Sequence, residues 1–430
     1  MLPVLIAGAC RGDSDDPETD PTGTVQRPVV LTFMAYGPEE EVAAYESMVH
    51  RFNEENEGVS VSLVKVGDQN EALAQLRSGD TPDIFLLSRR DLAEITEKKL
   101  NQPIDELLDS RGVDFSDLYK RDALQAFSRD AHLQCMPYGI SPMVIYYNTS
   151  LIDFDAMEEQ GLPRPASPAS WTFDQFTAAA EYSSRKGIKG VYIEPSLSGL
   201  APFIYSGGGD LFDDDQDPTS LALSSDDSVA ALNRTMAVLR KNRLTPTPRQ
   251  LRQESALERF TTGKLGMIAG FRSLVPELRK TPSLNFDVMP MPTLDAEKTI
   301  GDVAGLCMSA EATSRGDAAN FIVHAISSES VSEVAEAGYL VPSNNEVAGS
   351  DAFLQPDQLP ANADVFNRSV RDIVVTPLIE SFPRLERSVH DLIYQLFYAV
   401  VLDMEETTTA IDEASRPVID PEAAAEEEDN

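Results

Sequence analysis

Cysteine, histidine and long apolar runs are scarce in this chain of 430 residues, and their scarcity excludes several classes of protein. The three cysteines, Cys10, Cys135 and Cys307, are too few for a disulfide framework or a closed zinc site. The four histidines are scattered, and no HExxH, CxxC or Cys/His cluster is present, so we expect neither a metal site nor a cofactor. No run of 18 apolar residues occurs, so the sequence predicts no bilayer-spanning helix.

Basic residues are also few, because 35 Lys and Arg stand against 71 Asp and Glu, a net charge of −36. This balance disfavours nucleic acid as a partner, since binding to a phosphate backbone needs clustered Lys and Arg. It likewise disfavours electrostatic docking on an anionic membrane surface. With 42% hydrophobic and 25% charged residues, the composition is typical of a globular protein, and the length suggests two or three domains.

The first 27 residues differ from the rest in composition. Residues 1–9 are apolar and small and end in Ala-Gly-Ala before Cys10, and residues 11–27 are rich in Gly, Asp, Ser, Pro and Thr. This arrangement resembles a bacterial lipoprotein signal with its lipid-attachment cysteine. We therefore expect residues 1–27 to be a signal remnant and flexible tether, with Cys10 lipidated and the protein held outside the cytoplasm on the cell membrane by this anchor alone. The alternative is a frayed cytosolic N-terminus.

From residue 29 the pattern is that of an α/β protein. Strands are predicted over 29–34, 59–64 and 83–87, with helices over 39–56 and 70–78 between them. This order predicts a parallel, doubly wound sheet, whose ligands meet the carboxyl ends of the strands. The candidate binding residues at those ends are Tyr36, Ser88, Arg89, Arg90 and Asp91.

Later segments continue the pattern. Strands are predicted over 144–148, 190–193, 265–269 and 286–289, and the chain is mostly helical from 317 to about 409. Residues 411–430 are expected to form an acidic disordered tail.

Catalytic signatures are missing. The sequence has no GxSxG elbow, no GxxxxGK[ST] loop and no GxGxxG fingerprint, and the Asp213-Asp214-Asp215 run is expected to be a solvated loop. We therefore expect that the protein is not an enzyme, that it has no catalytic residue and that it binds no metal.

Seven segments, in order, resemble the extracellular solute-binding proteins of ABC importers, in the sugar-binding branch that includes maltose-binding protein. They lie between residues 29 and 403 and read FNEEN (52–56), GDTPDI (79–84), MPYG followed by IYYN (136–148), ASWTFDQF (169–176), YSGGGDLF (205–212), FTTGKLGM (260–267) and GYLVP (338–342). The family's usual Trp after the sixth segment is replaced by Phe271. Each match alone is weak, but seven matches in the order found in the family are hard to obtain by chance.

The resemblance implies a two-lobed, periplasmic-binding-protein-like α/β fold of type II, closing on a ligand about three hinge crossings. By analogy the crossings are expected near 139–144, 268–271 and 308–314. Lobe 1 would then comprise residues 28–141 plus 269–307, and lobe 2 would comprise 142–268 plus 308–410. Cys135 and Cys307 lie beside predicted crossings; a disulfide outside the cell is an alternative, but two buried thiols are expected.

The resemblance also adds binding candidates to those at the strand ends. Sugar sites combine aromatic faces with carboxylate, amide or guanidinium partners for hydroxyls. The added candidates, which fall in segments that line the family's cleft, are Tyr138, Tyr205, Gly208, Phe271, Arg272 and Tyr339. For each one, core packing or surface exposure is an equally open interpretation, and an ion pair within the acidic lobe is the alternative for Arg89 and Arg90.

The expected function is capture of a small solute, a mono- or oligosaccharide, by a monomeric lipoprotein that delivers it to the permease subunits of an ABC importer. One alternative is a polyamine or other cationic solute on the same fold, which the net charge of −36 makes credible. A second is a ligand-free adaptor that contacts a membrane sensor.

Overall fold

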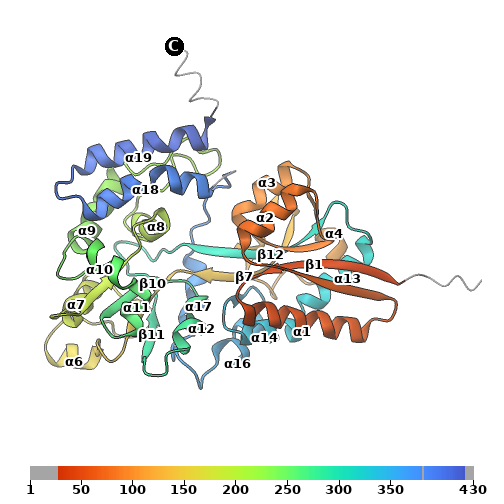
Figure 1. Cartoon of the computed structure of the whole chain (residues 1–430), viewed down its shortest axis with the longest axis horizontal. Coiled ribbons are helices and arrows are strands. Elements are labelled where there is room, and N and C mark those ends of the chain that lie inside the picture. The colour runs from red at the N-terminus through yellow and green to blue at the C-terminus, as the bar shows by residue number, and fades with distance from the viewer. Residues whose placement is uncertain (1–27, 380–381, 422–430) are drawn as a thin grey trace, which may run out of the picture.

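Two α/β lobes lie side by side in the computed structural model, which describes residues 28–379 and 382–421 (Figure 1). Lobe 1 is built on a seven-stranded sheet and lobe 2 on a four-stranded one. Two long strands, β7 (Cys135–Pro142) and β12 (Gly301–Ser309), run from lobe 1 toward lobe 2. The two-lobed α/β fold expected from the sequence is confirmed.

The sheet of lobe 1 has the order β13-β7-β12-β3-β1-β2, with β4 beside β12. Strands β1, β2 and β3 are parallel, as predicted, whereas β12 runs antiparallel to both β3 and β7. The other strands of this lobe are β1 (Val29–Tyr36), β2 (Val59–Val66), β3 (Ile84–Ser88), β4 (Asn101–Gln102), β13 (Val341–Pro342) and the separate hairpin β5 (Ser128–Arg129) and β6 (His132–Leu133).

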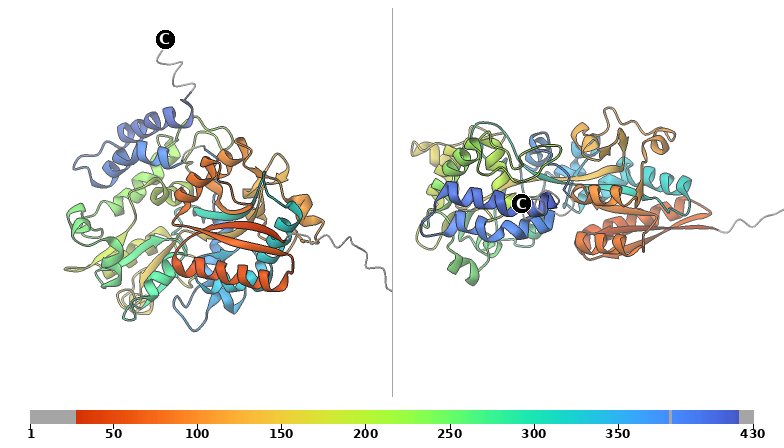
Figure 2. Two further views of the ribbon diagram at one scale, coloured as in Figure 1. Left: turned by 45° about the vertical axis from the view of Figure 1, so that its right-hand side comes forward. Right: turned by 90° about the horizontal axis from the view of Figure 1, so that it is seen from above.

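Helices cover both faces of this sheet (Figures 1 and 2). Helix α1 (Glu39–Glu55) buries Tyr45, Met48, Val49 and Phe52 on one face, each side chain contributing about 1.5–3 kcal/mol by removal from water. Helix α2 (Gln69–Ser78) begins where Asp68 accepts the N–H of Glu71. It ends at Gly79, whose φ of +86° suits a left-handed C-cap.

The remaining helices of lobe 1 are mostly short. Helices α13 and α14 pack beside α1. The full set is η1 (Arg89–Asp91), α3 (Leu92–Glu97), α4 (Asp105–Asp109), α5 (Arg121–Ala126), α13 (Arg315–Ala325), α14 (Ser328–Glu336), α15 (Asn345–Ala348), α16 (Asp351–Leu354), α17 (Asp364–Ser369) and η2 (Val370–Asp372).

Lobe 2 is organised around the sheet β11-β8-β10-β9. Its core contains Trp171, whose indole N–H donates to the carbonyl of Pro290 at 2.8 Å. The strands are β8 (Val144–Asn148), β9 (Lys189–Tyr192), β10 (Leu265–Gly270) and β11 (Phe286–Met289). The helices are α6 (Phe154–Glu159), α7 (Phe173–Ser183), α8 (Leu197–Ser206), α9 (Asp226–Leu239), α10 (Pro248–Gln253), α11 (Ala256–Thr261), α12 (Leu274–Arg279), α18 (Phe382–Tyr398) and α19 (Met404–Ile419).

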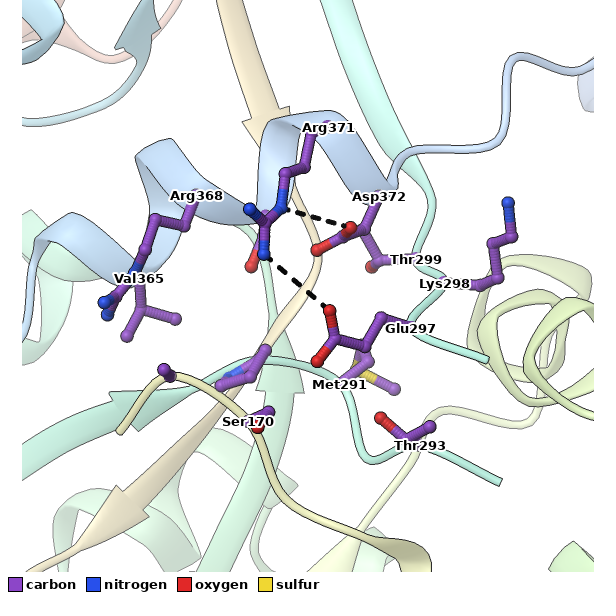
Figure 3. Close-up of a pocket in the computed structure, with 13 residues that line it drawn as sticks. Ser170, Met291, Thr293, Glu297, Lys298, Thr299, Val365, Arg368, Arg371 and Asp372 are labelled. Atoms are coloured by element: carbon purple, nitrogen blue, oxygen red, sulfur yellow. Dashed lines mark ion pairs between the residues drawn. The ribbon is translucent and has the colours of Figure 1, made fainter. Parts of the chain in front are cut away.

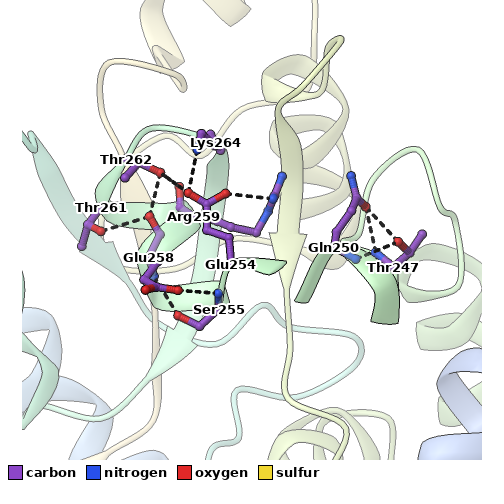
Figure 4. A network of polar contacts seen from close by, with 9 residues as sticks. All are labelled: Thr247, Gln250, Glu254, Ser255, Glu258, Arg259, Thr261, Thr262 and Lys264. Carbon is purple, nitrogen blue, oxygen red and sulfur yellow. Dashed lines mark hydrogen bonds and ion pairs between the residues drawn. The ribbon is translucent and has the colours of Figure 1, made fainter. Parts of the chain in front are cut away.

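Side-chain caps set the starts of α10 and α11 (Figure 4). Thr247 and Ser255 are the N-caps, and Gln250 and Glu258 close a capping box in each case. Between the two helices Glu254 pairs with Arg259 at 3.2 Å and with Lys264 at 2.6 Å. These local contacts fix the approach of the chain to β10, which ends at the cleft.

Three chain crossings join the lobes, and backbone hydrogen bonds hold them together. At the first crossing the N–H of Met143 donates to the carbonyl of Ile300, which lies on the second crossing, at 2.8 Å. At the second, the N–H of Thr299 donates to the carbonyl of Asp372 at 2.8 Å, and Val374 returns a bond to Thr299 at 2.9 Å. The crossings therefore lie side by side at about residues 143, 300 and 373.

The expected lobe boundaries are wrong at the second and third crossings. Residues 269–300 stay in lobe 2, because β10 is antiparallel to β8 and β11 returns to pair with the other edge of β8. Residues 308–342 belong to lobe 1, since β13 pairs with β7. The expected crossings rest on the positions of the motifs, whereas strand pairing decides to which lobe each segment belongs. The first crossing lies within the expected 139–144.

The expected disordered tail over 411–430 is wrong for its first part. Residues 411–419 belong to α19, where Ile411 is fully buried and the Asp412 carboxylate accepts the N–H groups of Leu223 and Ser224 at 2.9 Å each. Acidic composition alone predicted a solvated tail. It does not show that one of these acids, Asp412, points inward and accepts hydrogen bonds from two backbone N–H groups. Residues 422–430, like Cys10 and the expected tether over 1–27, lie outside the described residues.

Cys135 and Cys307 form a disulfide rather than the two free thiols that we expected. The two residues are direct cross-strand partners on β7 and β12, and both are fully buried. A separation of 172 residues hid this adjacency in the sequence.

Removing this disulfide is expected to destabilise the protein. In the double variant Cys135→Ala/Cys307→Ala, the closed loop of 172 residues is released, so the free energy of unfolding should fall by about 2–5 kcal/mol. Urea unfolding followed by circular dichroism measures this change. Wild-type protein unfolded with a reductant is the control, and an unchanged urea midpoint in the double variant would contradict the linkage.

Candidate ligand-binding cleft

A cavity of about 430 Å³ lies between the lobes. Its wall includes residues from both lobes and from all three crossings, among them Ser141, Ile300 and Ile373. The size lies within the range of small-molecule sites, and a site between two lobes is a common place for one. Both lobes and all three crossings therefore contribute to the wall of one cavity.

The lobe 1 wall is formed by the carboxyl ends of β1 and β3. Tyr36 ends β1, and Arg89 and Arg90 follow β3 in η1. Ser88 begins η1 by accepting the N–H of Arg90 at 3.4 Å, and its own hydroxyl donates to Asp302 at 2.7 Å. Parallel strands bring these groups to one edge, as the sequence pattern predicts.

Arg89 presents unused donors to the cavity. Its Nε donates to the carbonyl of Ala126 at 3.0 Å, and among the described residues its Nη atoms have no hydrogen-bond partner. Burial lowers the pKa of Arg89 to about 10, while the charge of Asp302 opposes that shift. The guanidinium remains charged at neutral pH and keeps donors for a solute.

Arg90 is held differently. Its Nη2 donates to Gln69 at 2.7 Å, and Gln69 in turn donates to the Asp91 carboxylate at 2.6 Å. This chain of contacts orients Arg90 at the cavity wall and places Asp91 behind it, away from the cavity.

Aromatic side chains reach the cavity from both lobes. Tyr36 and Tyr339 come from lobe 1, and Phe271 and Phe382 come from lobe 2. The hydroxyl of Tyr339 donates to Glu40 at 2.9 Å, which fixes its ring. A solute in the cavity can therefore contact aromatic side chains from both lobes.

Five of the candidate residues line the cavity: Tyr36, Arg89, Arg90, Phe271 and Tyr339. Six do not line it: Ser88, Asp91, Tyr138, Tyr205, Gly208 and Arg272. Ser88 orients the Asp302 carboxylate, and Asp91 accepts a hydrogen bond from Gln69, which in turn accepts one from Arg90.

Tyr138 and Arg272 are core residues. Tyr138 points into lobe 1, where its ring lies 5.9 Å from that of Tyr45 and its hydroxyl has no hydrogen-bond partner among the described residues. Arg272 is fully buried, with its guanidinium 4.9 Å from the ring of Phe353 and 5.0 Å from that of Phe366. Burial lowers the pKa of Arg272 to about 10.

Tyr205 and Gly208 shape the end of α8. Tyr205 is buried in the lobe 2 core, and burial raises the pKa of its hydroxyl. Gly208 has a φ of +88°, a conformation that glycine adopts without strain, in the turn that follows the helix. Both positions serve the fold beside the cleft.

Several cavity residues were missed from the sequence, chiefly Glu41, Asp302, Ser198 and Phe382. Glu41 reads as an ordinary acid in the first turn of a helix. Asp302 follows the second crossing, whose position was wrong. Asp302 lies at the start of β12, a strand that was not predicted from the sequence.

A second, much smaller pocket of about 10 Å³ lies beside the crossings (Figure 3). Arg371 bridges Glu297 at 3.7 Å and Asp372 at 3.6 Å there. The space is about that of one water molecule, so it cannot hold a solute.

The part of the chain that the structure describes contains no group of three or more His, Cys, Asp or Glu arranged to hold a metal ion. Within the same residues, no helix combines the length and the apolar character needed to cross a membrane.

Residues 47–361 match the model of the bacterial extracellular solute-binding protein family. The chain belongs to this family. The match covers most of the chain, including large parts of both lobes and the first two crossings, while β1, α18 and α19 lie outside it. Family members are binding proteins of the cell exterior, in agreement with the recognition made from the sequence motifs.

Solved structures agree on the fold. The ABC substrate-binding protein Lmo0181 of Listeria monocytogenes, in complex with cycloalternan, has a TM-score of 0.74 and 18% identity over 90% of this chain and 97% of its own. The GacH receptor of Streptomyces glaucescens gives 0.70 and 19%, over 91% and 98%. The cyclic α-maltosyl-1,6-maltose binding protein of Arthrobacter globiformis gives 0.71 and 19%, over 92% and 100%. Comparison with curated proteins gives no match.

Two tyrosines test the division between core and cleft. The hydroxyl of Tyr138 has no partner among the described residues, so Tyr138→Phe should leave the free energy of unfolding unchanged or raise it by up to about 1 kcal/mol. Tyr146→Phe is the matched control, because the Tyr146 hydroxyl donates to Phe271 at 2.6 Å and its loss should cost about 1–2 kcal/mol. Urea unfolding measures both; a destabilised Tyr138→Phe variant would show that its hydroxyl is paired.

Proposed function

We propose that this protein captures a carbohydrate in the cleft between its lobes and presents it to the permease of an ABC importer. The observation that carries the proposal is the interlobe cavity, whose wall combines aromatic side chains from both lobes with charged groups. Saccharides offer apolar C–H faces and many hydroxyls, so they match such a wall.

The polar groups of the cavity suit hydroxyl recognition. Arg89 keeps free Nη donors, and Asp302 has a carboxylate oriented by Ser88. A charged donor and a charged acceptor at one edge can bind neighbouring hydroxyls of one sugar ring, because charge-assisted hydrogen bonds are roughly twice as strong as neutral ones.

The ligands of similar structures support the same class. The Listeria protein is in complex with cycloalternan, and the Streptomyces receptor is described with acarbose. Both are carbohydrate-type compounds held by the fold that this chain shares.

Capture is proposed to proceed by lobe closure about the crossings near residues 143, 300 and 373. A solute favours the closed state only as far as it contacts both lobes better there than in the open state. Tyr36 and Arg89 on lobe 1, with Phe271 on lobe 2, would supply those contacts. Because these contacts come from both lobes, a bound solute would shift the equilibrium between the open and closed states.

The anchoring remains a proposal that rests on the sequence. Cys10, preceded by Ala-Gly-Ala, would carry the lipid, and the polar residues after it would tether a monomer to the membrane near its permease. Release of the protein into the medium by Cys10→Ser would support this arrangement.

A cationic solute on the same fold is the second candidate, favoured by the carboxylate of Glu41 in the cavity wall. The structure favours a ligand-free adaptor less, because the cavity between the lobes has a volume of about 430 Å³, which is enough for a small solute.

The carbohydrate proposal predicts ligand-dependent stabilisation. Among neutral, acidic and amino-substituted oligosaccharides, at least one should raise the melting temperature and reduce the radius of gyration in solution scattering. Arg89→Met should weaken its binding at least about tenfold in calorimetry, since a hydrogen bond to a charged group contributes about 1.5–3 kcal/mol.

Arg249→Met is the control, because this exposed arginine of α10 does not line the cavity. If no oligosaccharide in the panel shifts the melting temperature, the carbohydrate assignment is wrong. If one binds while the radius of gyration stays constant, the closure step is wrong.

A further inference from the structure

The carboxylate of Glu41 occupies an unusual place in the cavity wall. Glu41 lies in the first turn of α1, just after the loop that carries Gly37. Gly37 has a φ of +143°, and a Cβ there would lie 2.7 Å from Oε2 of Glu41. The glycine thus leaves room for the carboxylate to fold back against the wall.

This carboxylate has no cationic partner in the part of the chain that the structure describes. Among the described residues no Lys, Arg or His lies within ion-pair distance of Glu41, and its carboxylate accepts a weak hydrogen bond from the Tyr45 hydroxyl at 3.4 Å. Burial raises the pKa of Glu41 to about 7, and the Tyr45 contact opposes that shift only in part. An unpaired, partly buried carboxylate is costly to the fold, so its position in a cleft calls for a partner.

The groups that face Glu41 are tyrosines. Tyr36 comes from the end of β1, Tyr45 from the next turn of α1, and Tyr339 from the segment before β13; all three line the cavity. Tyr138 on β7 lies behind them. The negative charge of Glu41 contributes to raising the pKa of each of these hydroxyls. We call Glu41, Tyr36, Tyr45 and Tyr339 the acidic corner.

The other charges near the acidic corner do not neutralise it. Glu40 accepts the hydroxyl of Tyr339 and pairs with Lys280 at 3.4 Å, so that lysine is already engaged. Asp302 and Asp91 act on Tyr36 with the same negative sign, and Arg90 acts on it with the opposite one. A carboxylate surrounded by tyrosine rings is the combination that attracts an ammonium group, through charge and through the ring faces.

We propose, on the footing of the carbohydrate-binding function above, that the captured solute bears a positively charged nitrogen that docks against Glu41 in the acidic corner. The solute class becomes an amino-substituted or quaternary-ammonium-bearing saccharide or polyol. Its hydroxyls would meet Arg89 and Asp302, and its cationic nitrogen would supply the counter-charge that no described residue gives to Glu41.

Such docking has a defined pH dependence. A cation binds the ionised form of Glu41, so its affinity rises as pH increases through about 7. With half-ionisation near that value, the ionised fraction falls about tenfold between pH 8 and pH 6, and the affinity should fall by the same factor. The ligand-free protein behaves oppositely: because the folded-state pKa is raised, the stability of wild type relative to Glu41→Gln should increase as pH falls from 8 to 5.

A matched pair of probes tests the inference with the intact protein. Choline carries a permanent charge, and 3,3-dimethyl-1-butanol is its neutral isostere, so pH changes alter only the protein. Choline should raise the melting temperature more than the butanol does, with an affinity about tenfold weaker at pH 6 than at pH 8. Glu41→Gln should abolish the difference between the probes, whereas Glu39→Gln, which removes an exposed acid from the same helical turn, should retain it.

Equal effects of the two probes, no effect of either, or a choline preference that persists in Glu41→Gln would overturn the inference. The oligosaccharide panel separates this failure from that of the broader function. If a neutral oligosaccharide closes the lobes of wild type and Glu41→Gln alike, the acidic corner is not a cation site but carbohydrate capture stands. If neither the probes nor any oligosaccharide binds, both proposals are wrong.

Discussion

The hydrogen bonds that tie the three crossings together are the constraint on which the rest of the molecule depends. Met143, Thr299 and Val374 belong to segments far apart in the sequence, yet their backbone groups form one small ladder. The sheet of lobe 1 meets this ladder through β7, which leads into it, and β12, which leads out of it, and the sheet of lobe 2 meets it through β8, which begins at Val144. The cavity is the space that the two sheets leave on one side of it, and the Arg371 ion pairs lie beside it (Figure 3).

The chemistry of the cleft follows from where strands end. The carboxyl ends of β1 and β3 deliver Tyr36 and Arg89, and β12 carries Asp302 to the same place from the second crossing. Ser88 holds Asp302 and Gln69 holds Arg90, so the charged groups are oriented by side chains that never face the cavity. Glu41 stands apart, because its neighbours are aromatic and no described residue offers it a cation.

Local patterns allowed the fold to be predicted further than the site. The strands and helices of 29–88 came from apolar periodicity, and the cleft residues among them were found because carboxyl ends of parallel strands converge. The lobe boundaries failed at 269–300 because an antiparallel return such as β11 leaves no trace in motif order. The prediction that Tyr138 and Arg272 line the cleft was wrong for a related reason. A motif gives the position of a residue along the chain, whereas core packing decides which way its side chain points. The disulfide between Cys135 and Cys307 joins distant segments, so one sequence does not reveal it. The same is true of Glu41, because only the folded arrangement shows that no described residue offers it a cation.

The disulfide between β7 and β12 has a topological consequence. Most of lobe 2, from β8 to the second crossing, is strung between Cys135 and Cys307, so it forms a covalently closed ring mounted on lobe 1. A single peptide-bond cut anywhere in that ring would open the chain without separating it into two molecules. Proteases outside the cell could therefore nick the exposed loops of this lobe while both fragments remained attached to the same hinge.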